Sequence, residues 1–541
     1  MLRRIIAAAV CLSFVAASCS SSSDDNQSES TRSSSPVSGG ELVMGIDGGN
    51  SGGWCLPEAQ LAAAGIQMGK AIYEPLTAIN ADGEYVPFLA ESMEPNADFT
   101  SWTIKIREGI KFHDGTDLDA TVVKNNIDAL RGEYPARSPL LATFTLADID
   151  TVTEPDSMTV EITTLDSWPT LPSYFGSGGR FGIMGQAQLD DQETCDSNLI
   201  GTGPFSLEEW VPNGHFTATK FADYWQVDSD GTRLPYLDKI TFRPMVEADA
   251  RMNSLLSGQI HMLHGSGAPQ LETLTEEAEA GVVDIYRTEK FSEVTYEMLN
   301  AAKEPFNNKN ARLALAHSFD RDLYNEVVGL GFQTSASGPF APGNLGYLED
   351  AGLPEYDLEK AKSYVAKYTA ETGKPLSFNR LTVSGADSLQ NAQFFQSESA
   401  KAGIEITIQQ VEQAALINRA LGGDWQSIGW RNHPGGDPDL QRAWWFSSSP
   451  VNFGGIDDPD IDALLGEGRK ETDLEKRQEI YADLNRRFGE QAYNLWRNWT
   501  LWYKAMAPNV GGILGPNLPD GSEPFPGLSS GNPVSGLWMS P

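Results

Sequence analysis

Hydrophobic and polar residues alternate strictly in residues 101–106, whose sequence is Ser-Trp-Thr-Ile-Lys-Ile. A period of two is expected of a β-strand with one buried face. Residues 116–119, Thr-Asp-Leu-Asp, then have the composition of a helix cap. After the cap, apolar residues recur at helical spacing at Ala120, Val123, Ile127 and Leu130. The pattern therefore predicts a strand, a turn and a helix in succession.

Similar patterns predict that strands and helices interleave along the whole chain. Further strands are expected at residues 41–46, 156–164 and 239–244. Helices are expected from Leu61 to Tyr73, along the apolar stripe Leu315, Phe319, Leu323 and Val327, and after caps at Asp458 and Thr472. The chain is thus expected to be of the α/β class. Residues 508–541, rich in Gly and Pro, are expected to be irregular and to lie on the surface.

The length and charge of the chain limit its organisation and its partners. At about 150 residues per domain, 541 residues predict two to four domains. The formal net charge is -35, which would repel the phosphates of nucleic acids and anionic lipid headgroups. We therefore expect no nucleic-acid binding, and we interpret the acidity as a solubilising surface.

The N-terminus predicts export and a lipid anchor. Residues 1–18 contain a basic start and a short apolar stretch, as in a signal peptide. Small residues before Cys19 resemble the lipobox of bacterial lipoproteins, although Ala16 stands where Leu is usual. Cleavage elsewhere, which would give an unlipidated secreted protein, stays an alternative. The Ser-rich remainder of residues 19–40 predicts a flexible tether.

Two of the four cysteines remain after Cys11 in the signal and Cys19 at the anchor. In an oxidising compartment Cys55 and Cys195 are expected to form a disulfide. Two buried free thiols are the alternative.

Five segments in order resemble one family, the extracytoplasmic solute-binding proteins of ABC importers that carry oligopeptides, dipeptides or nickel, known as family 5. The most specific segment is WTIKIREGIKFHDGTDLDA, residues 102–120. The others are AIYEPL at 71–76, GTGPFSLEEW at 201–210, the region from Asn300 to Arg321, and the helical region 458–481. The resemblance covers nearly all of residues 41–510.

The resemblance implies a type II periplasmic-binding-protein fold, with two lobes and an additional α/β domain inserted in the first lobe. Residues 41–79, 196–280 and 500–541 are expected to form the core of lobe I, residues 80–195 the additional domain, and residues 281–499 lobe II. The hinge is then expected near residues 280 and 500. The lobes close over a ligand in this mechanism.

The resemblance also implies what the protein does and where. It implies a monomer without catalytic activity or cofactor, which delivers a peptide or similar small polar solute to an ABC permease and ATPase complex. The lipid anchor would hold it on the extracytoplasmic side of the cell membrane. A surface sensor that keeps the fold without transport is an alternative.

Ser51 raises a different possibility, because Gly49-Asn50-Ser51-Gly52-Gly53 matches the G-x-S-x-G pattern of serine hydrolases. A trypsin-like order is excluded, since the first histidine, His113, follows Ser51. The strand-turn-helix context of a hydrolase elbow is also missing, because Trp54 to Pro57 follow the glycines. A secreted serine hydrolase therefore stays only the alternative. In the resembling family this loop borders the ligand cleft.

Residues 429–446 contain the richest mixture of aromatic and polar residues. In peptide binders of the family, an aspartate three residues after the corresponding Trp pairs with the peptide amine, whereas here that position is His433. The nearest carboxylate is Asp437, and Arg431 suits an anionic ligand through a bidentate contact. An ordinary turn followed by a buried aromatic cluster is the alternative. The residues expected to line the cleft are Asn50, Ser51, Tyr73, Trp430, Arg431, Asn432, His433, Asp437 and Trp444.

Histidines are too few and too scattered for a metal site. His261 and His264 lie close together, but no cysteine or further histidine is near them in the sequence. We expect no metal bound by the protein itself.

Overall fold

The computed structural model describes residues 35–541, apart from residues 51, 60, 141, 177–179, 433–435 and 530. The side chains of residues 413, 414 and 432 are also outside the description. The expected signal peptide, the lipid anchor at Cys19 and most of the expected tether lie outside the described residues. Among the described residues, no helix is both long and apolar enough to cross a membrane.

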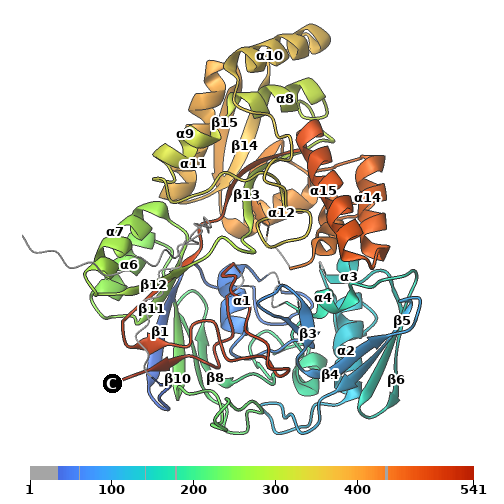
Figure 1. The fold of residues 1–541 in the computed structure, drawn as a ribbon, viewed down its shortest axis with the longest axis vertical. Helices are drawn as coiled ribbons and strands as arrows, with labels where there is room; N and C mark the ends of the chain where they lie inside the picture. The colour runs from blue at the N-terminus through green and yellow to red at the C-terminus, as the bar shows by residue number, and fades with distance from the viewer. Residues whose placement is uncertain are drawn as a thin grey trace, which may run out of the picture. The chain divides into compact units, whose positions relative to one another are not determined.

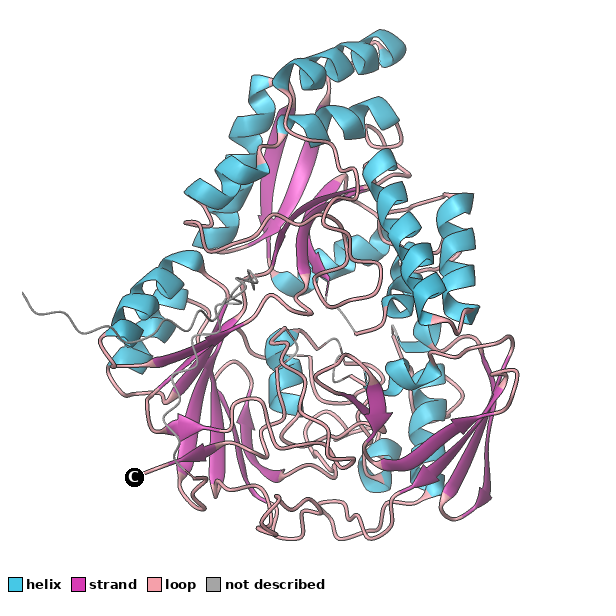
Figure 2. Cartoon of the chain, viewed as in Figure 1, coloured by secondary structure: helices cyan, strands magenta, loops and turns pink. Residues whose placement is uncertain are grey.

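A seven-stranded sheet forms the centre of what we call lobe I (Figures 1 and 2). Its order is β12 (Asp284–Arg287), β18 (Tyr503–Met506), β11 (Met262–Gly265), β1 (Glu41–Ile46), β10 (Lys239–Pro244), β9 (His215–Lys220) and β8 (Phe205–Val211). Strand β1 pairs in parallel with both β10 and β11, and its side chains Leu42, Met44 and Ile46 are buried. The strands expected at 41–46 and 239–244 are confirmed. Helices α1 (Ala63–Gly69), α6 (Ala248–Leu256) and α7 (Ala268–Glu279) belong to this lobe.

A four-stranded antiparallel sheet forms what we call the additional domain. Its order is β4 (Ala90–Pro95), β5 (Ser101–Ile106), β7 (Thr159–Thr164) and β6 (Ile149–Asp156). The alternation expected at 101–106 is confirmed, since Trp102, Ile104 and Ile106 are buried. Helix α2 (Ala120–Arg131) follows, and the Asp119 side chain accepts a hydrogen bond from Val122 N at its start. The strand expected at 156–164 begins only at Thr159. Shorter elements accompany the sheet: β2 (Thr77–Ile79), β3 (Tyr85–Pro87), α3 (Ala142–Thr145), α4 (Leu171–Gly176) and α5 (Gln186–Asp190).

A five-stranded sheet forms what we call lobe II. Its order is β15 (Glu405–Val411), β14 (Ser377–Val383), β16 (Ser427–Asn432), β13 (Val294–Leu299) and β17 (Asn494–Trp499). Its helices are α8 (Lys309–Ser318), α9 (Arg321–Val327), α10 (Leu358–Thr372), α11 (Ala386–Lys401), α12 (Gln413–Gly422), the 3-10 helix η1 (Pro438–Gln441), α13 (Arg442–Trp445), α14 (Pro459–Lys470) and α15 (Leu474–Gln491). Helices α8, α10 and α11 lie at the end of the sheet that carries β14 and β15 (Figure 1).

Two expectations about helices need correction. The apolar stripe from Leu315 to Val327 predicted one helix, but α8 ends at Ser318 and α9 begins at Arg321. The chain breaks there because the Asp320 side chain accepts from Leu323 N and caps a new helix. The helix expected after Thr472 is capped by Asp473 instead.

The chain crosses between the lobes twice, and one crossing is later than expected. Strand β12 pairs with β18 in the lobe I sheet, so that sheet extends to residue 287 rather than ending at 280. The first crossing lies between β12 and β13, and the second between β17 and β18. The expected boundary at residue 280 places β12 in lobe II, whereas the structure pairs this strand within the lobe I sheet.

The C-terminal segment is not a surface wrapping, contrary to expectation. Leu528, Leu537 and Trp538 are buried, and β20 (Trp538–Met539) pairs with β19 (Val510–Gly511). A Cβ added to Gly531 would lie 2.3 Å from the Gln67 side chain of α1. Several carbonyl oxygens of the segment accept hydrogen bonds from side chains, including Gly531 O from Lys70 and Ile513 O from Lys504.

The two expected cysteines are joined. Cys55 and Cys195 form a disulfide with a Cα–Cα distance of 5.2 Å. It links the loop after β1 to the segment after α5, within the core of lobe I.

Candidate ligand-binding site

Arg431, at the end of β16, lies in a polar group at the second crossing between the lobes. Its Nε is 2.9 Å from Oε1 of the fully buried Glu293, and its guanidinium lies 4.7 Å from the ring centre of Trp502. Trp502 Nε1 also donates to Glu293 Oε1, at 2.9 Å. The Arg431 side chain is 36% exposed. Glu293 and Trp502 therefore hold the guanidinium in a fixed orientation while part of it faces solvent.

The Trp502 ring rests on a histidine from lobe I. The rings of Trp502 and His264 are stacked, 4.2 Å apart. Gln67 Nε2 lies 2.8 Å from His264 Nδ1, and His264 Nε2 lies 3.1 Å from Leu528 O. Burial, followed by the charges of nearby basic side chains, holds the pKa of His264 well below its usual range. A neutral ring that accepts from Gln67 and donates to Leu528 satisfies both nitrogens, so His264 has a structural role.

A second arginine, Arg180 of the additional domain, interacts electrostatically with the same carboxylate. Arg180 donates from Nε and Nη2 to Leu61 O, at 3.0 and 2.7 Å. Burial lowers the pKa of Arg180, and the charge of Glu293 opposes that shift. The charges of Arg180 and Arg431 thus both act on the buried carboxylate of Glu293.

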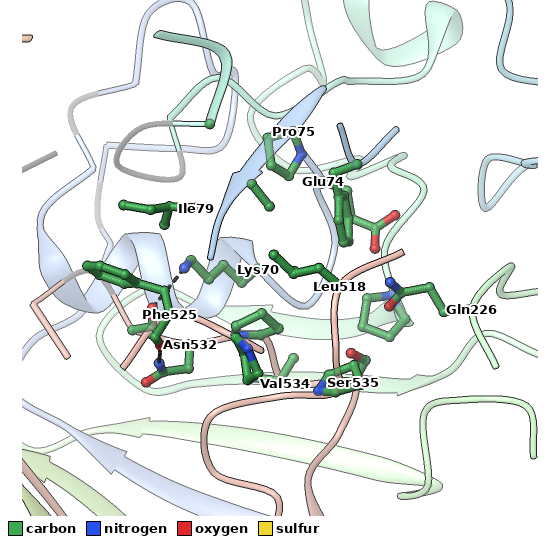
Figure 3. A pocket seen from close by; sticks show the side chains of 18 of the residues that line it. Lys70, Glu74, Pro75, Ile79, Gln226, Leu518, Phe525, Asn532, Val534 and Ser535 are labelled. Carbon is green, nitrogen blue, oxygen red and sulfur yellow. Dashed lines mark hydrogen bonds between the residues drawn. The ribbon is translucent and has the colours of Figure 1, made fainter. Parts of the chain in front are cut away.

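A partly open cavity of about 120 Å³ lies between α1 and the C-terminal segment (Figure 3). Its walls come from the end of α1 and the segment after it, the β2–β3 hairpin, the C-terminal segment, and Gly436 of lobe II. Lining residues include Lys70, Tyr73, Glu74, Pro75, Ile79, Tyr85, Phe88, Gln226, Gly436, Leu518, Phe525, Asn532, Val534 and Ser535. Apolar walls with a few polar groups are typical of ligand sites.

Lys70 is the cation of the cavity. Its Nζ donates to Gly531 O at 2.8 Å, and burial lowers its pKa to about 8. In Figure 3 its side chain extends between Ile79 and Phe525. The amine is therefore held against the C-terminal segment at the edge of an apolar space.

Glu74 is the only carboxylate among the described residues that line the cavity. It accepts hydrogen bonds from Thr202 and Trp225, both at 2.9 Å. The Tyr224 hydroxyl lies 2.6 Å from Glu74 Oε1 and 2.7 Å from Gln226 Oε1, and its one proton cannot serve both oxygens. Burial raises the pKa of Glu74 to about 7, which agrees with a proton on this carboxyl at neutral pH.

Gly436 closes the cavity from lobe II. Its N–H donates to the Tyr85 hydroxyl of the additional domain at 2.9 Å. A Cβ at this position would lie 2.2 Å from Ile79 Cδ1 and 3.2 Å from Gly83 O. The approach of the two backbones therefore needs a glycine here.

The residues expected to line the ligand cleft lie in several different parts of the structure. Tyr73 lines the cavity, and its hydroxyl is within hydrogen-bond distance of Gln188 Oε1. Asn50 is buried, and its amide donates to Gly53 O within its own loop. Trp430 and Trp444 both pack edge-on against Phe453.

The remaining expected residues lie at or next to gaps in the described chain. Asp437 is paired bidentately with Arg477, at 2.8 and 2.9 Å, and caps η1 through Asp439 N. Ser51, His433 and the Asn432 side chain lie outside the described residues.

Sequence reasoning missed several residues of the site: Lys70, Glu74, Tyr85, Arg180, Glu293, Trp502 and Phe525. The segment AIYEPL carries the family resemblance, but the resemblance predicts no role for its Glu74. The others carry no local motif, because the fold alone brings them together.

Comparisons with known proteins agree on one family. The family model of bacterial extracellular solute-binding proteins, family 5 middle, matches residues 84–453. The glutathione-binding protein GsiB of Pectobacterium atrosepticum is 25% identical over 433 residues, which cover 76% of this chain and 80% of that protein.

Two solved structures share the fold. The periplasmic binding protein DppA of Helicobacter pylori, in complex with the peptide STSA, superposes with a TM-score of 0.82 at 21% identity, covering 93% of this chain and 99% of that chain. The oligopeptide-binding protein AppA of Bacillus subtilis, in complex with a nonapeptide, has a TM-score of 0.79 at 22% identity, covering 94% and 100%.

Proposed function

Because the chain belongs to the bacterial extracellular solute-binding proteins of family 5, we propose that it captures a peptide or similar small polar solute between its lobes and delivers it to the permease and ATPase of an ABC importer. The observation that carries this proposal is the cavity that lobe I and the additional domain line and that Gly436 of lobe II closes. Residues from both sides of the boundary between the lobes thus line one cavity.

The two crossings between the lobes supply the hinge. Both are short segments between strands of different sheets, where a few backbone dihedrals can absorb a rigid-body rotation. Arg431, Glu293 and Trp502 lie at this hinge. The contact between a ligand and Arg431 would therefore depend on the relative position of the lobes.

The ligand contacts follow from residue type. Tyr73 contributes to the cavity wall, while Trp430 and Trp444 give apolar surface near Arg431. Arg431 and Arg180 suit an anionic group of the solute. The expected contacts of Asn50, Ser51, Asn432, His433 and Asp437 belong to the same proposal.

The membrane attachment is part of the proposal as well. Residues 1–18 would be removed as a signal peptide, Cys19 would carry the lipid, and a monomer would remain on the extracytoplasmic side of the membrane. Replacing Cys19 by Ala should move the protein from the membrane fraction to the soluble extracytoplasmic fraction. An unchanged distribution contradicts the anchor.

Small-angle scattering together with thermal unfolding tests the capture mechanism. The probes are glutathione, the tetrapeptide Ser-Thr-Ser-Ala and the extract of small molecules released when the purified protein is denatured. A binding solute should raise the melting temperature and reduce the radius of gyration. A radius that stays constant for a solute that does bind contradicts closure.

The proposal includes no catalytic step. Mass spectrometry of the solute after incubation should recover it unchanged. A hydrolysed solute, with hydrolysis lost in Ser51→Ala, would instead support an enzyme.

A further inference from the structure

We propose that the cavity beside Lys70 is the subsite for a carboxylate of the solute, with Lys70 as its counter-ion. This inference rests on the proposed function and deepens it, because it names the chemical group that the solute must carry. The proposal starts from an incomplete hydrogen-bond set. An ammonium group has three donors, and within the part of the chain that the structure describes, Lys70 Nζ donates one hydrogen bond, to Gly531 O.

The charges around the cavity favour an anion. Lys504 is 3% exposed and donates to Ile513 O, and its charge and that of Lys70 act on one another. Glu74 already receives hydrogen bonds from neighbouring side chains and carries a proton over part of the neutral range. Two buried amines therefore lie near enough for their charges to interact, while the one carboxyl among the described lining residues is partly protonated, so an added carboxylate would balance the amines.

The walls and size of the cavity restrict the group further. Pro75, Ile79, Phe88 and Phe525 form apolar walls. A volume of about 120 Å³ is somewhat less than the roughly 150 Å³ of a cavity that holds benzene. The subsite therefore fits a short aliphatic acid, such as the end of an acidic side chain or a terminal carboxylate, of roughly five non-hydrogen atoms.

Burial makes the ion pair selective. A carboxylate in an apolar space is costly without a partner, and a buried amine is costly without an anion. A neutral amide of the same shape would leave the ammonium uncompensated. The cavity should therefore distinguish an acid from its amide, although the two have almost the same volume.

Propionate and propionamide test this distinction at equal ionic strength and pH 7, because they share shape and differ in charge. Thermal unfolding and isothermal titration would be measured for the wild type, Lys70→Met and Lys111→Met. Lys111 is an exposed lysine paired with Asp117, and it serves as the matched control. The wild type and Lys111→Met should bind propionate at least roughly tenfold more tightly than propionamide, and Lys70→Met should lose that preference.

A measurement on the wild type keeps the test independent of the variant's folding. With lysine labelled by ¹⁵N at Nζ, propionate should raise the pKa of Lys70 and shift its resonance, while propionamide should not. Equal binding of acid and amide, a preference that survives in Lys70→Met, or an unmoved Lys70 resonance would overturn the proposal.

The test separates this inference from the proposed function. A protein that closes on a peptide but ignores propionate keeps the function and loses the subsite. A protein that binds propionate at Lys70 but never compacts with any solute keeps the subsite and loses the function.

Discussion

The Thr170 hydroxyl donates a hydrogen bond to Asp439 Oδ2 at 2.7 Å, joining the additional domain to lobe II. Asp439 is fully buried and also accepts from Trp168 Nε1 and from Arg469 Nε. Burial raises the pKa of Asp439, but the charge of Arg469 and the bond from Thr170 outweigh it and hold the pKa below its usual value. Asp439 and Arg469 both belong to lobe II, so we expect the ion pair to persist when the lobes separate, and the bonds from Trp168 and Thr170 to be lost.

Replacing Thr170 by Val should weaken closure without touching the cavity. The substitution removes one donor to a buried carboxylate, which costs about 1–2 kcal/mol in the closed form, or roughly 5–30-fold in solute affinity. Titration calorimetry with a bound solute would measure the change. Thr151→Val is the matched control, because Thr151 lies on an exposed strand of the same domain and should leave the affinity unchanged. An equal loss in both variants would indicate a general effect on the domain.

Replacing Gly436 by Ala should also disfavour the closed form. The added methyl group would overlap Ile79 Cδ1, which lies 2.2 Å from the new Cβ, and push that side chain toward the cavity. Overpacking of this kind costs about 1–3 kcal/mol, so solute affinity should fall and the radius of gyration with solute should rise.

Gly466→Ala is the control for that substitution. Gly466 lies in α14 with no atom within 4 Å of an added Cβ. Helix propensity predicts unchanged binding and a stability gain of about 0.5–1 kcal/mol. If Gly436→Ala binds solute as the wild type does, Gly436 does not limit closure.

Removing the disulfide should destabilise lobe I. Cys55 and Cys195 are 140 residues apart in sequence, so the crosslink restricts a long loop in the unfolded chain. The double variant Cys55→Ala, Cys195→Ala should lose about 2–5 kcal/mol of unfolding free energy in urea. Reductant should lower the stability of the wild type and leave the double variant unaffected. A reductant effect of equal size in both would argue against the disulfide as its source.

Glu74 should make stability fall as the pH rises through the acidic range. Its pKa is raised from 4.5 to about 7 by burial, so between these values the folded state binds more protons than the unfolded state. The stabilisation is therefore complete below pH 4.5 and is lost as the pH approaches 7, by roughly 3 kcal/mol.

Glu74→Gln should remove that slope, because the amide keeps the shape and does not titrate. Urea unfolding at intervals from pH 4.5 to pH 7 would give the free energy of unfolding of both proteins. The difference between the two values cancels the contributions of all other titrating groups. Glu279→Gln, at an exposed position, should keep the wild-type slope. Parallel curves for the wild type and Glu74→Gln would show that folding does not shift the pKa of Glu74.

Local patterns predicted elements well where they came with their own boundaries. The strand at residues 101–106 was predicted from its strict alternation of apolar and polar residues, and α2 from its cap and the apolar repeat that follows. The start of α14 was predicted from Asp458, which caps it. The break between α8 and α9 was missed because an apolar stripe continues across it, and only the Asp320 side chain reveals the second cap.

The candidate site was predicted less well, because its residues are distant in sequence. Lys70, Gly436 and Phe525 meet in one cavity although they lie far apart in the sequence. The C-terminal segment gave no periodic signal, since its Pro and Gly residues fit irregular backbone and its carbonyls are satisfied by side chains such as Lys504. Arg431 was predicted as an anion-binding residue, but its pairing with Glu293 depends on a neighbouring strand.

The strand order of lobe I has a consequence for biogenesis. Strand β12 reaches its sheet only through β18, which comes more than two hundred residues later in the chain and is inserted beside β11. The nascent polypeptide therefore cannot finish this sheet until almost all of it has been synthesised. Such delayed pairing of distant strands favours slow folding, so the last steps of assembling lobe I depend on the very end of translation.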